Sequence, residues 1–168
     1  PSSQIILVPF PQRNSNNDRW RAETRGSTIS IISGSLPFKS LAVQRLYEQL
    51  RHEIFHLWMP NGIDLSGNYD WFFEGFTIYH ALRTGLELNQ IRFEDFLNTL
   101  GRAYDLTQIF NETQTLSLIE ASKKRWQNDN NFLYAKGMIV AFLCDLSLQR
   151  ETKGKQNLKK VLGKIYEK

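Results

Sequence analysis

Two histidines and a glutamate between residues 50 and 60 have the types and the spacing to carry out metal-dependent chemistry. From Leu50 to Pro60 the chain reads Leu-Arg-His-Glu-Ile-Phe-His-Leu-Trp-Met-Pro. On a helix, His52 and His56 are four residues apart and lie on one face, so both imidazoles can reach one ion. Glu53 projects beside that ion, where it can act as general base toward a water that the metal also holds. The pattern predicts a zinc hydrolase, although a polar stripe on a surface helix would give the same string.

A third zinc ligand is expected in the aromatic stretch that follows. Glu74 is the only charged residue from Trp71 to Tyr79, and a lone carboxylate in such surroundings must be paired or bound to a metal. Catalytic zinc sites with two histidines often take a glutamate as the third protein ligand and leave the fourth position to water. Glu74 is therefore predicted to complete the site, with an ion pair to an arginine as the alternative. His80 lies six residues further along the same helix and is not expected to be a ligand.

These motifs resemble those of the gluzincin aminopeptidases, which comprise the alanyl aminopeptidase and leukotriene hydrolase group and the glycyl aminopeptidases. The resemblance rests on the H-E-x-x-H pattern and on the later Trp-x-x-Glu-Gly-Phe-Thr, and His-Glu-Ile-Phe-His-Leu-Trp is most similar to the glycyl group. It implies a mainly helical α+β, thermolysin-like catalytic domain. It also implies a Zn²⁺ cofactor held by His52, His56 and Glu74, and a peptide or protein substrate.

The resemblance assigns a role to two further residues. Residues 22–28 are similar to Leu-Glu-His-Arg-Ser-Ser-Thr of the glycyl aminopeptidases, whose edge-strand glutamate binds the substrate's free amino group, and this role falls on Glu23. Tyr-x-Lys-Gly at the start of a long apolar helix resembles the family's catalytic tyrosine motif, and this role falls on Tyr134. A phenol O–H at that place would stabilise the oxyanion that forms during amide hydrolysis. The alternatives are a surface position for Glu23 and a capping or packing role for Tyr134.

Three features depart from the family's pattern. Met59 stands where the glycyl group has an asparagine, and Ala81 stands where an acidic residue is common seven positions after the zinc glutamate. Ala81 removes part of the shell that would orient the ligands. Seventeen residues separate His56 from Glu74, one fewer than is usual in the alanyl aminopeptidases, and the missing residue falls in a turn.

The elements that must position these residues are a short β segment over 1–34 and helices over 35–168. Residues 4–10 and 28–32 have the composition of strands, and the polar stretch 12–19 between them is a loop. The first helix is expected to begin with Ser35 as cap and Pro37 in its first turn, and to end at Pro60. Its apolar stripe predicts a core element, and comprises Val43, Leu46, Leu50, Ile54 and Leu57.

A second helix over about 70–84 is predicted to run antiparallel to the first and to stop at Gly85, which brings Glu74 opposite the histidines. Further helices are expected over 92–100 and 115–126. Cys144, within an apolar run, is expected to be a buried small hydrophobe.

Length and charge limit the remaining possibilities. The 168 residues suit one catalytic domain, which we expect to be a fragment of a longer protein with additional domains. No apolar run approaches the length of a membrane span. The net charge is +4, but the excess lysines alternate with apolar residues near the C-terminus in the manner of a solvated helix face. No recognised nucleic-acid module is present, so nucleic acid is not an expected partner.

The sequence thus predicts a zinc metallopeptidase of the aminopeptidase kind, with Glu53 and Tyr134 as catalytic residues. Three alternatives remain: an endopeptidase on the same scaffold, favoured if Glu23 faces away from the site; a different hydrolysis at the same zinc; and a metal-binding or interaction module without catalysis. Ala81 and Met59 are the residues that give the last alternative its weight.

Overall fold

Within the residues that the structure describes, a three-stranded sheet precedes six helices. The computed structural model describes residues 3–9, 20–34, 36–63, 65–113, 117–124 and 131–167. The strands are β1 (Gln4–Pro9), β2 (Arg21–Arg25) and β3 (Thr28–Ser33). The helices are α1 (Lys39–His56), α2 (Asp70–Glu87), α3 (Phe93–Thr113), α4 (Leu118–Lys123), α5 (Asn131–Glu151) and α6 (Leu158–Tyr166). The mainly helical α+β fold with its strands at the start of the chain is confirmed.

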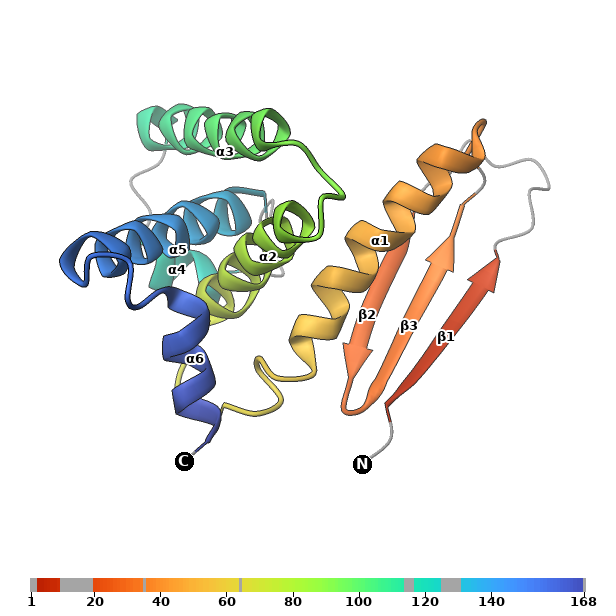
Figure 1. Cartoon of the computed structure of the whole chain (residues 1–168), viewed down its shortest axis with the longest axis horizontal. Coiled ribbons are helices and arrows are strands. Elements are labelled where there is room, and N and C mark those ends of the chain that lie inside the picture. Colours follow the sequence, from red (N-terminus) through yellow and green to blue (C-terminus); the bar gives the residue numbers. More distant parts are fainter. Residues whose placement is uncertain are drawn as a thin grey trace.

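The sheet has the order β1-β3-β2, with β1 parallel and β2 antiparallel to the central β3. β2 and β3 are joined by a tight turn at Gly26, whose φ of 56° falls in the left-handed region that suits glycine. α1 packs against β2 and β3 and lies between the sheet and the other helices (Figure 1). Alternation along β3 buries Ile29 and Ile31 completely and leaves Ser30 exposed.

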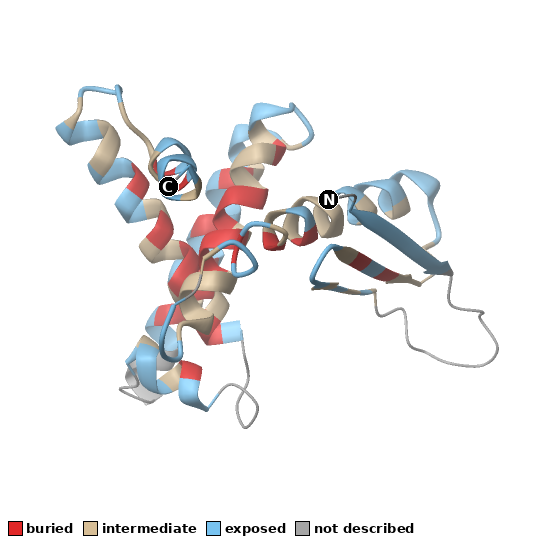
Figure 2. Cartoon of the chain, turned by 90° about the horizontal axis from the view of Figure 1, so that it is seen from below, coloured by how far each residue is buried: buried red, intermediate tan, exposed pale blue. Residues whose placement is uncertain are grey.

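The core of the helical part lies around α2 and α5, where buried residues concentrate (Figure 2). Two glycines let these helices touch through their backbones. A Cβ added to Gly75 would lie 2.3 Å from the carbonyl carbon of Gly137, and one added to Gly137 would lie 2.3 Å from the carbonyl oxygen of Trp71. Because only glycine fits at such a distance, the two helices are fixed in close contact.

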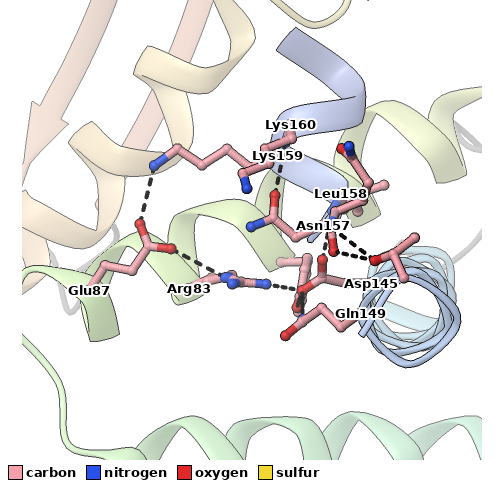
Figure 3. Close-up of polar contacts among 11 residues, drawn as sticks. Arg83, Glu87, Asp145, Gln149, Asn157, Leu158, Lys159 and Lys160 are labelled. Atoms are coloured by element: carbon pink, nitrogen blue, oxygen red, sulfur yellow. Dashed lines mark hydrogen bonds and ion pairs between the residues drawn. The ribbon is translucent and has the colours of Figure 1, made fainter. Parts of the chain in front are cut away.

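A fully buried carboxylate, Asp145 of α5, joins three helices (Figure 3). It accepts hydrogen bonds from the hydroxyl of Tyr79 at 2.6 Å and from the backbone N–H of Leu158 at 2.6 Å, and it pairs with Arg83. Leu158 is the first residue of α6, so Asp145 fastens the start of that helix to α2 and α5. Buried charges are tolerated when they are paired and hydrogen-bonded in this way.

The first helix differs from its prediction in two respects. α1 begins at Lys39, so Pro37 precedes the helix instead of lying in its first turn, and Phe38 occupies the cap position without a side-chain hydrogen bond. Ser35 lies outside the described residues. The apolar stripe is not a core face: Val43 is 36% and Ile54 is 37% exposed, whereas the buried residues of α1 are Glu53 and His56.

Other boundaries also differ. α2 continues past Gly85 to Glu87, so this glycine does not end the helix. Gly85 is buried, and a Cβ added to it would lie 3.1 Å from the guanidinium carbon of Arg51, so the glycine makes room for that side chain. The helix predicted over 92–100 continues to Thr113. Of the helix predicted over 115–126, the described residues form α4, which begins with a capping box of Ser117 and Glu120, and the two residues at each end of that range lie outside the described residues.

The apolar run of α5 has one buried and one exposed face. Cys144 is exposed, contrary to its prediction, while the next residue, Asp145, is buried. By length and composition alone, α5 is also apolar enough to cross a membrane, which its sequence did not suggest. It packs against α2, α3, α4 and α6, and a central helix of a folded core has the same composition.

Candidate metal site and active-site cleft

His52 and His56 of α1 and Glu74 of α2 converge on one point. The two Nε2 atoms are 3.0 Å apart, and the Glu74 Oε2 atom lies 3.5 Å from that of His52 and 3.6 Å from that of His56. Donors about 2.1 Å from a tetrahedral Zn²⁺ are about 3.4 Å from one another. The three atoms therefore fit the ligand set of one metal ion, and they are the group of histidine, cysteine and carboxylate side chains that stands out for this among the described residues.

The local fold brings this about in two steps. The i, i+4 spacing on α1 places both imidazoles over the same face of the helix. The turns after Leu57 then reverse the chain, and α2 packs against α1 with Glu74 in its second turn. The predicted meeting of the two histidines with the distant glutamate is what the structure shows.

A backbone carbonyl sets the tautomer of His56. Its Nδ1 atom lies 2.7 Å from the carbonyl oxygen of Met59, which can only accept a hydrogen bond. In neutral His56 the proton is therefore on Nδ1, and the lone pair of Nε2 points to the candidate metal site. The hydrogen bond to Met59 thus prepares His56 as a neutral ligand.

The electrostatics of the cluster keep Glu74 ionised. Burial disfavours the carboxylate, but hydrogen bonds and charge attraction from His52 and His56 outweigh it and lower the pKa of Glu74. Burial likewise disfavours the charged form of His56, but the hydrogen bond and the negative charge of Glu74 raise the pKa of His56 overall. A permanently charged carboxylate between two imidazoles is a suitable donor set for a divalent cation.

The predicted catalytic residues lie beside this cluster. Glu53, Tyr134 and His52 line one cleft of about 740 Å³ between α1, α2, α3 and α5. Glu53 is only 4% exposed although it lines the cleft. The structure therefore brings the candidate general base and the candidate oxyanion donor to the same cavity as His52, one of the three candidate ligands.

Glu23 is not part of this arrangement. Side chains alternate along β2, and those of Ala22 and Thr24 are the more buried, while Glu23 is 60% exposed and pairs with Arg25 at 2.7 Å. Ala22 lines the cleft and Thr24 contacts α1. The resemblance assigned the role to a residue of β2 that is exposed and faces the side of the sheet away from the cleft.

Thr24 contacts the candidate general base, which the sequence did not suggest. Its Oγ1 atom lies 2.6 Å from Oε2 of Glu53 and 2.9 Å from the carbonyl oxygen of the same residue. Knowing that β2 is a strand would have shown that only one of two adjacent residues, Glu23 or Thr24, can face α1. It would not have shown which.

Two other residues named from the sequence lie near the site without joining it. His80 is buried and stacks on the ring of Phe55, with centroids 4.6 Å apart, and is not among the converging ligands. Ala81 lines the cleft, and its carbonyl oxygen accepts a hydrogen bond from Arg51 at 3.0 Å. No acidic group therefore supports the ligands from position 81.

No family model matches the sequence, and comparison with curated proteins gives no match. Among solved structures, the chain is similar to the crystal structure of an aminopeptidase N family protein from Idiomarina loihiensis, with a TM-score of 0.77 at 19% sequence identity. The match covers 99% of this chain and 32% of that one, so the chain spans about a third of the length of its neighbour. A likeness at this identity shows the fold. The protein thus shares the fold of part of an aminopeptidase N family protein and carries a three-residue cluster that could bind a metal.

Proposed function

We propose that this chain is the catalytic part of a zinc metallopeptidase. The observation that carries the proposal is the convergence of His52, His56 and Glu74 at spacings that suit one tetrahedral ion. The fold shared with an aminopeptidase N family protein supports the choice of a peptide as substrate. Since the chain spans only part of that neighbour, further parts of a longer protein would contribute to substrate binding.

The proposed reaction is hydrolysis of a peptide bond. His52, His56 and Glu74 would hold Zn²⁺, which supplies Lewis acidity and lowers the pKa of a bound water to about 7. Glu53 takes a proton from the attacking water and passes it to the leaving amine. Tyr134, in the same cleft, donates a hydrogen bond from its hydroxyl group to the developing oxyanion.

Cleavage from the amino terminus is the first form of the proposal, because of the likeness to an aminopeptidase N family protein. The second form is an endopeptidase, and a specific observation favours it: Glu23, the residue expected to hold the free amino group, is 60% exposed and faces away from the cleft. Rates with peptides that differ only in amino-terminal acetylation separate the two. An aminopeptidase loses nearly all activity on the acetylated peptide, and an endopeptidase keeps it.

The decisive experiment compares the wild type with Glu53→Gln, with zinc content and peptidase activity measured on the same samples. We expect both proteins to bind one zinc and turnover to fall about 10²-fold or more in Glu53→Gln, since general base catalysis contributes on that order. Exchange of the exposed Glu94, away from the site, for Gln is the matched control and should leave turnover unchanged. Bound zinc without Glu53-dependent turnover would instead identify a metal-binding module.

A further inference from the structure

We propose that Thr24 is a positioning residue for the general base, holding the Glu53 carboxylate in the orientation in which it receives a proton. The inference rests on the proposed peptidase function, because it assigns Thr24 a part in the same reaction. It names a residue from the sheet as a component of the active site, next to the residue that the family resemblance had favoured.

The contact between these side chains is short and sheltered. Thr24 Oγ1 lies 2.6 Å from Glu53 Oε2, in the range of a hydroxyl bound to an ionised carboxylate, and Glu53 is 4% exposed. The hydroxyl has one proton to donate, and the shorter distance together with the negative charge directs it to Oε2 and not to the carbonyl oxygen at 2.9 Å. Thr24 thus restrains the carboxylate about its last two torsions.

The bond leaves one oxygen of the carboxylate for the reaction. Among the described residues, none donates a hydrogen bond to Oε1 of Glu53, whereas Oε2 is occupied by Thr24. A general base needs one oxygen within hydrogen-bond reach of the water it deprotonates. Fixing Oε2 therefore directs Oε1 toward the cleft that Glu53 shares with His52 and Tyr134.

Thr24 is itself held firmly. It pairs with Ile29 of β3, which is fully buried. Two residues on, the carbonyl oxygen of Gly26 accepts a hydrogen bond at 2.7 Å from the side chain of Asn61, in the turns after α1. The end of β2 is therefore fastened to β3 on one side and to the chain after the catalytic helix on the other, so the hydroxyl has a rigid support.

The competing explanation is that Thr24 merely ties the sheet to α1. A purely structural contact would affect the stability of the protein and would not change kcat once the protein is folded. Positioning affects kcat without affecting KM or zinc binding, and a serine, which keeps the hydroxyl, restores it. These readouts separate the two explanations.

The experiment measures kcat, KM and bound zinc for the wild type, Thr24→Val, Thr24→Ser and Glu53→Gln, well below their melting temperatures. Valine has the shape of threonine and favours strands, so it removes the hydroxyl with the least disturbance. Thr28→Val on β3 is the matched control, because it makes the same exchange on the neighbouring strand. Should Thr24→Val fold poorly, Thr24→Ala takes its place.

We expect Thr24→Val to lower kcat about tenfold or more, as small misplacements of catalytic groups do, with KM and zinc content within twofold of the wild type. Thr24→Ser should recover most of the loss, and Thr28→Val should show none. A kcat for Thr24→Val within twofold of the wild type, or a loss that Thr28→Val reproduces, overturns the positioning role while the proposed function stands. If the wild type shows no turnover that depends on Glu53, the proposed function fails and the role of Thr24 fails with it.

Discussion

The hydrogen bond from His56 Nδ1 to the Met59 carbonyl keeps His56 oriented without any help from the side chain at position 59, where the glycyl aminopeptidases have an asparagine. The bond uses a backbone oxygen 2.7 Å away, which is present whatever side chain stands at position 59. The Met59 side chain is fully buried and belongs to the hydrophobic core. A methionine in place of asparagine therefore leaves the orientation of His56 intact.

His80 is predicted to make the protein less stable in mild acid. It is buried against Phe55, and no described residue bonds its Nε2 atom. Burial, followed by the charges of Arg83 and Lys159, lowers the pKa of His80 to about 4. Because the unfolded chain takes up this proton below about pH 6.5 and the folded chain only below about 4, stability is lost as the pH falls between these values, by about 2 kcal/mol at pH 5.

The test compares the wild type with His80→Phe by urea unfolding at pH 7.5 and pH 5.0, both without metal. From pH 7.5 to pH 5.0 the free energy of unfolding should fall less in His80→Phe than in the wild type. The difference should be about 2 kcal/mol, because the phenylalanine ring does not titrate. The raised pKa of His56 acts in the opposite direction but equally in both proteins, so the comparison isolates His80. Equal losses in the two proteins would contradict the assignment.

At the scale of elements, the contact between α2 and α5 holds Tyr134 in the cleft that His52 also lines. Gly75 follows Glu74 directly, and Gly137 lies three residues after Tyr134, so the close approach of the two glycines fixes the segment that carries Tyr134 against the segment that carries Glu74. The glycines of the two motifs, Glu-Gly and Tyr-x-Lys-Gly, thus have a packing reason.

Gly137→Ala is predicted to damage both stability and turnover. The added methyl group would lie 2.3 Å from the Trp71 carbonyl oxygen, so α5 must move away from α2 and carry Tyr134 with it. We expect a loss of about 2 kcal/mol or more in the free energy of unfolding, as for other overpacked cores, and a fall in kcat in the fraction that remains folded. Gly101→Ala on α3 is the control: nothing lies within 4 Å of its Cβ, so helix propensity should raise stability by about 0.5–1 kcal/mol. Thermal unfolding and peptidase assays of both variants decide.

The elements also show what local sequence can and cannot predict. The H-E-x-x-H spacing was sufficient to place His52 and His56 on one face, because spacing along a helix is a local property. Glu74 was found in another way, as the lone charge of an aromatic stretch. Strand β2 carries no apolar alternation, since it reads Arg-Ala-Glu-Thr-Arg, and which of its faces meets α1 is decided by pairing with β3. Neither the register nor the hydrogen bond from Thr24 to Glu53 could be predicted from spacing.

The sequence also could not predict which residues of an apolar stretch are buried. Asp145 is fully buried and its neighbour Cys144 is exposed, because α5 is hydrophobic on several faces and its partners Tyr79 and Arg83 come from a helix more than sixty residues earlier. In α1 the apolar stripe predicted burial for Val43 and Ile54, but both side chains are exposed. Which side of a helix is covered depends on tertiary neighbours.

For the whole molecule, the site lies at the junction of two groups of elements. The sheet and α1 form one group, and α2 to α6 form the other. α1 packs against β2 and β3 within its own group and against α2 of the other group (Figure 1). Two of the candidate ligands come from α1 and the third from α2, while Thr24 of the sheet contacts Glu53 and Tyr134 comes from α5. An ion at this point would therefore join elements that are far apart in the chain.

Zinc is accordingly predicted to stabilise the whole fold. An ion that binds the folded protein alone adds about 2.7 kcal/mol at a free concentration one hundred times its dissociation constant, which for a chain of this size raises the melting temperature by roughly 5–10 °C. The melting temperature of the wild type should therefore rise with zinc and fall again with a chelator. Glu74→Gln, which replaces the charged ligand, should lose most of this shift, and Glu87→Gln, an exposed carboxylate on the same helix, should keep it. A shift of the same size in Glu74→Gln would mean that the ion binds elsewhere on the chain.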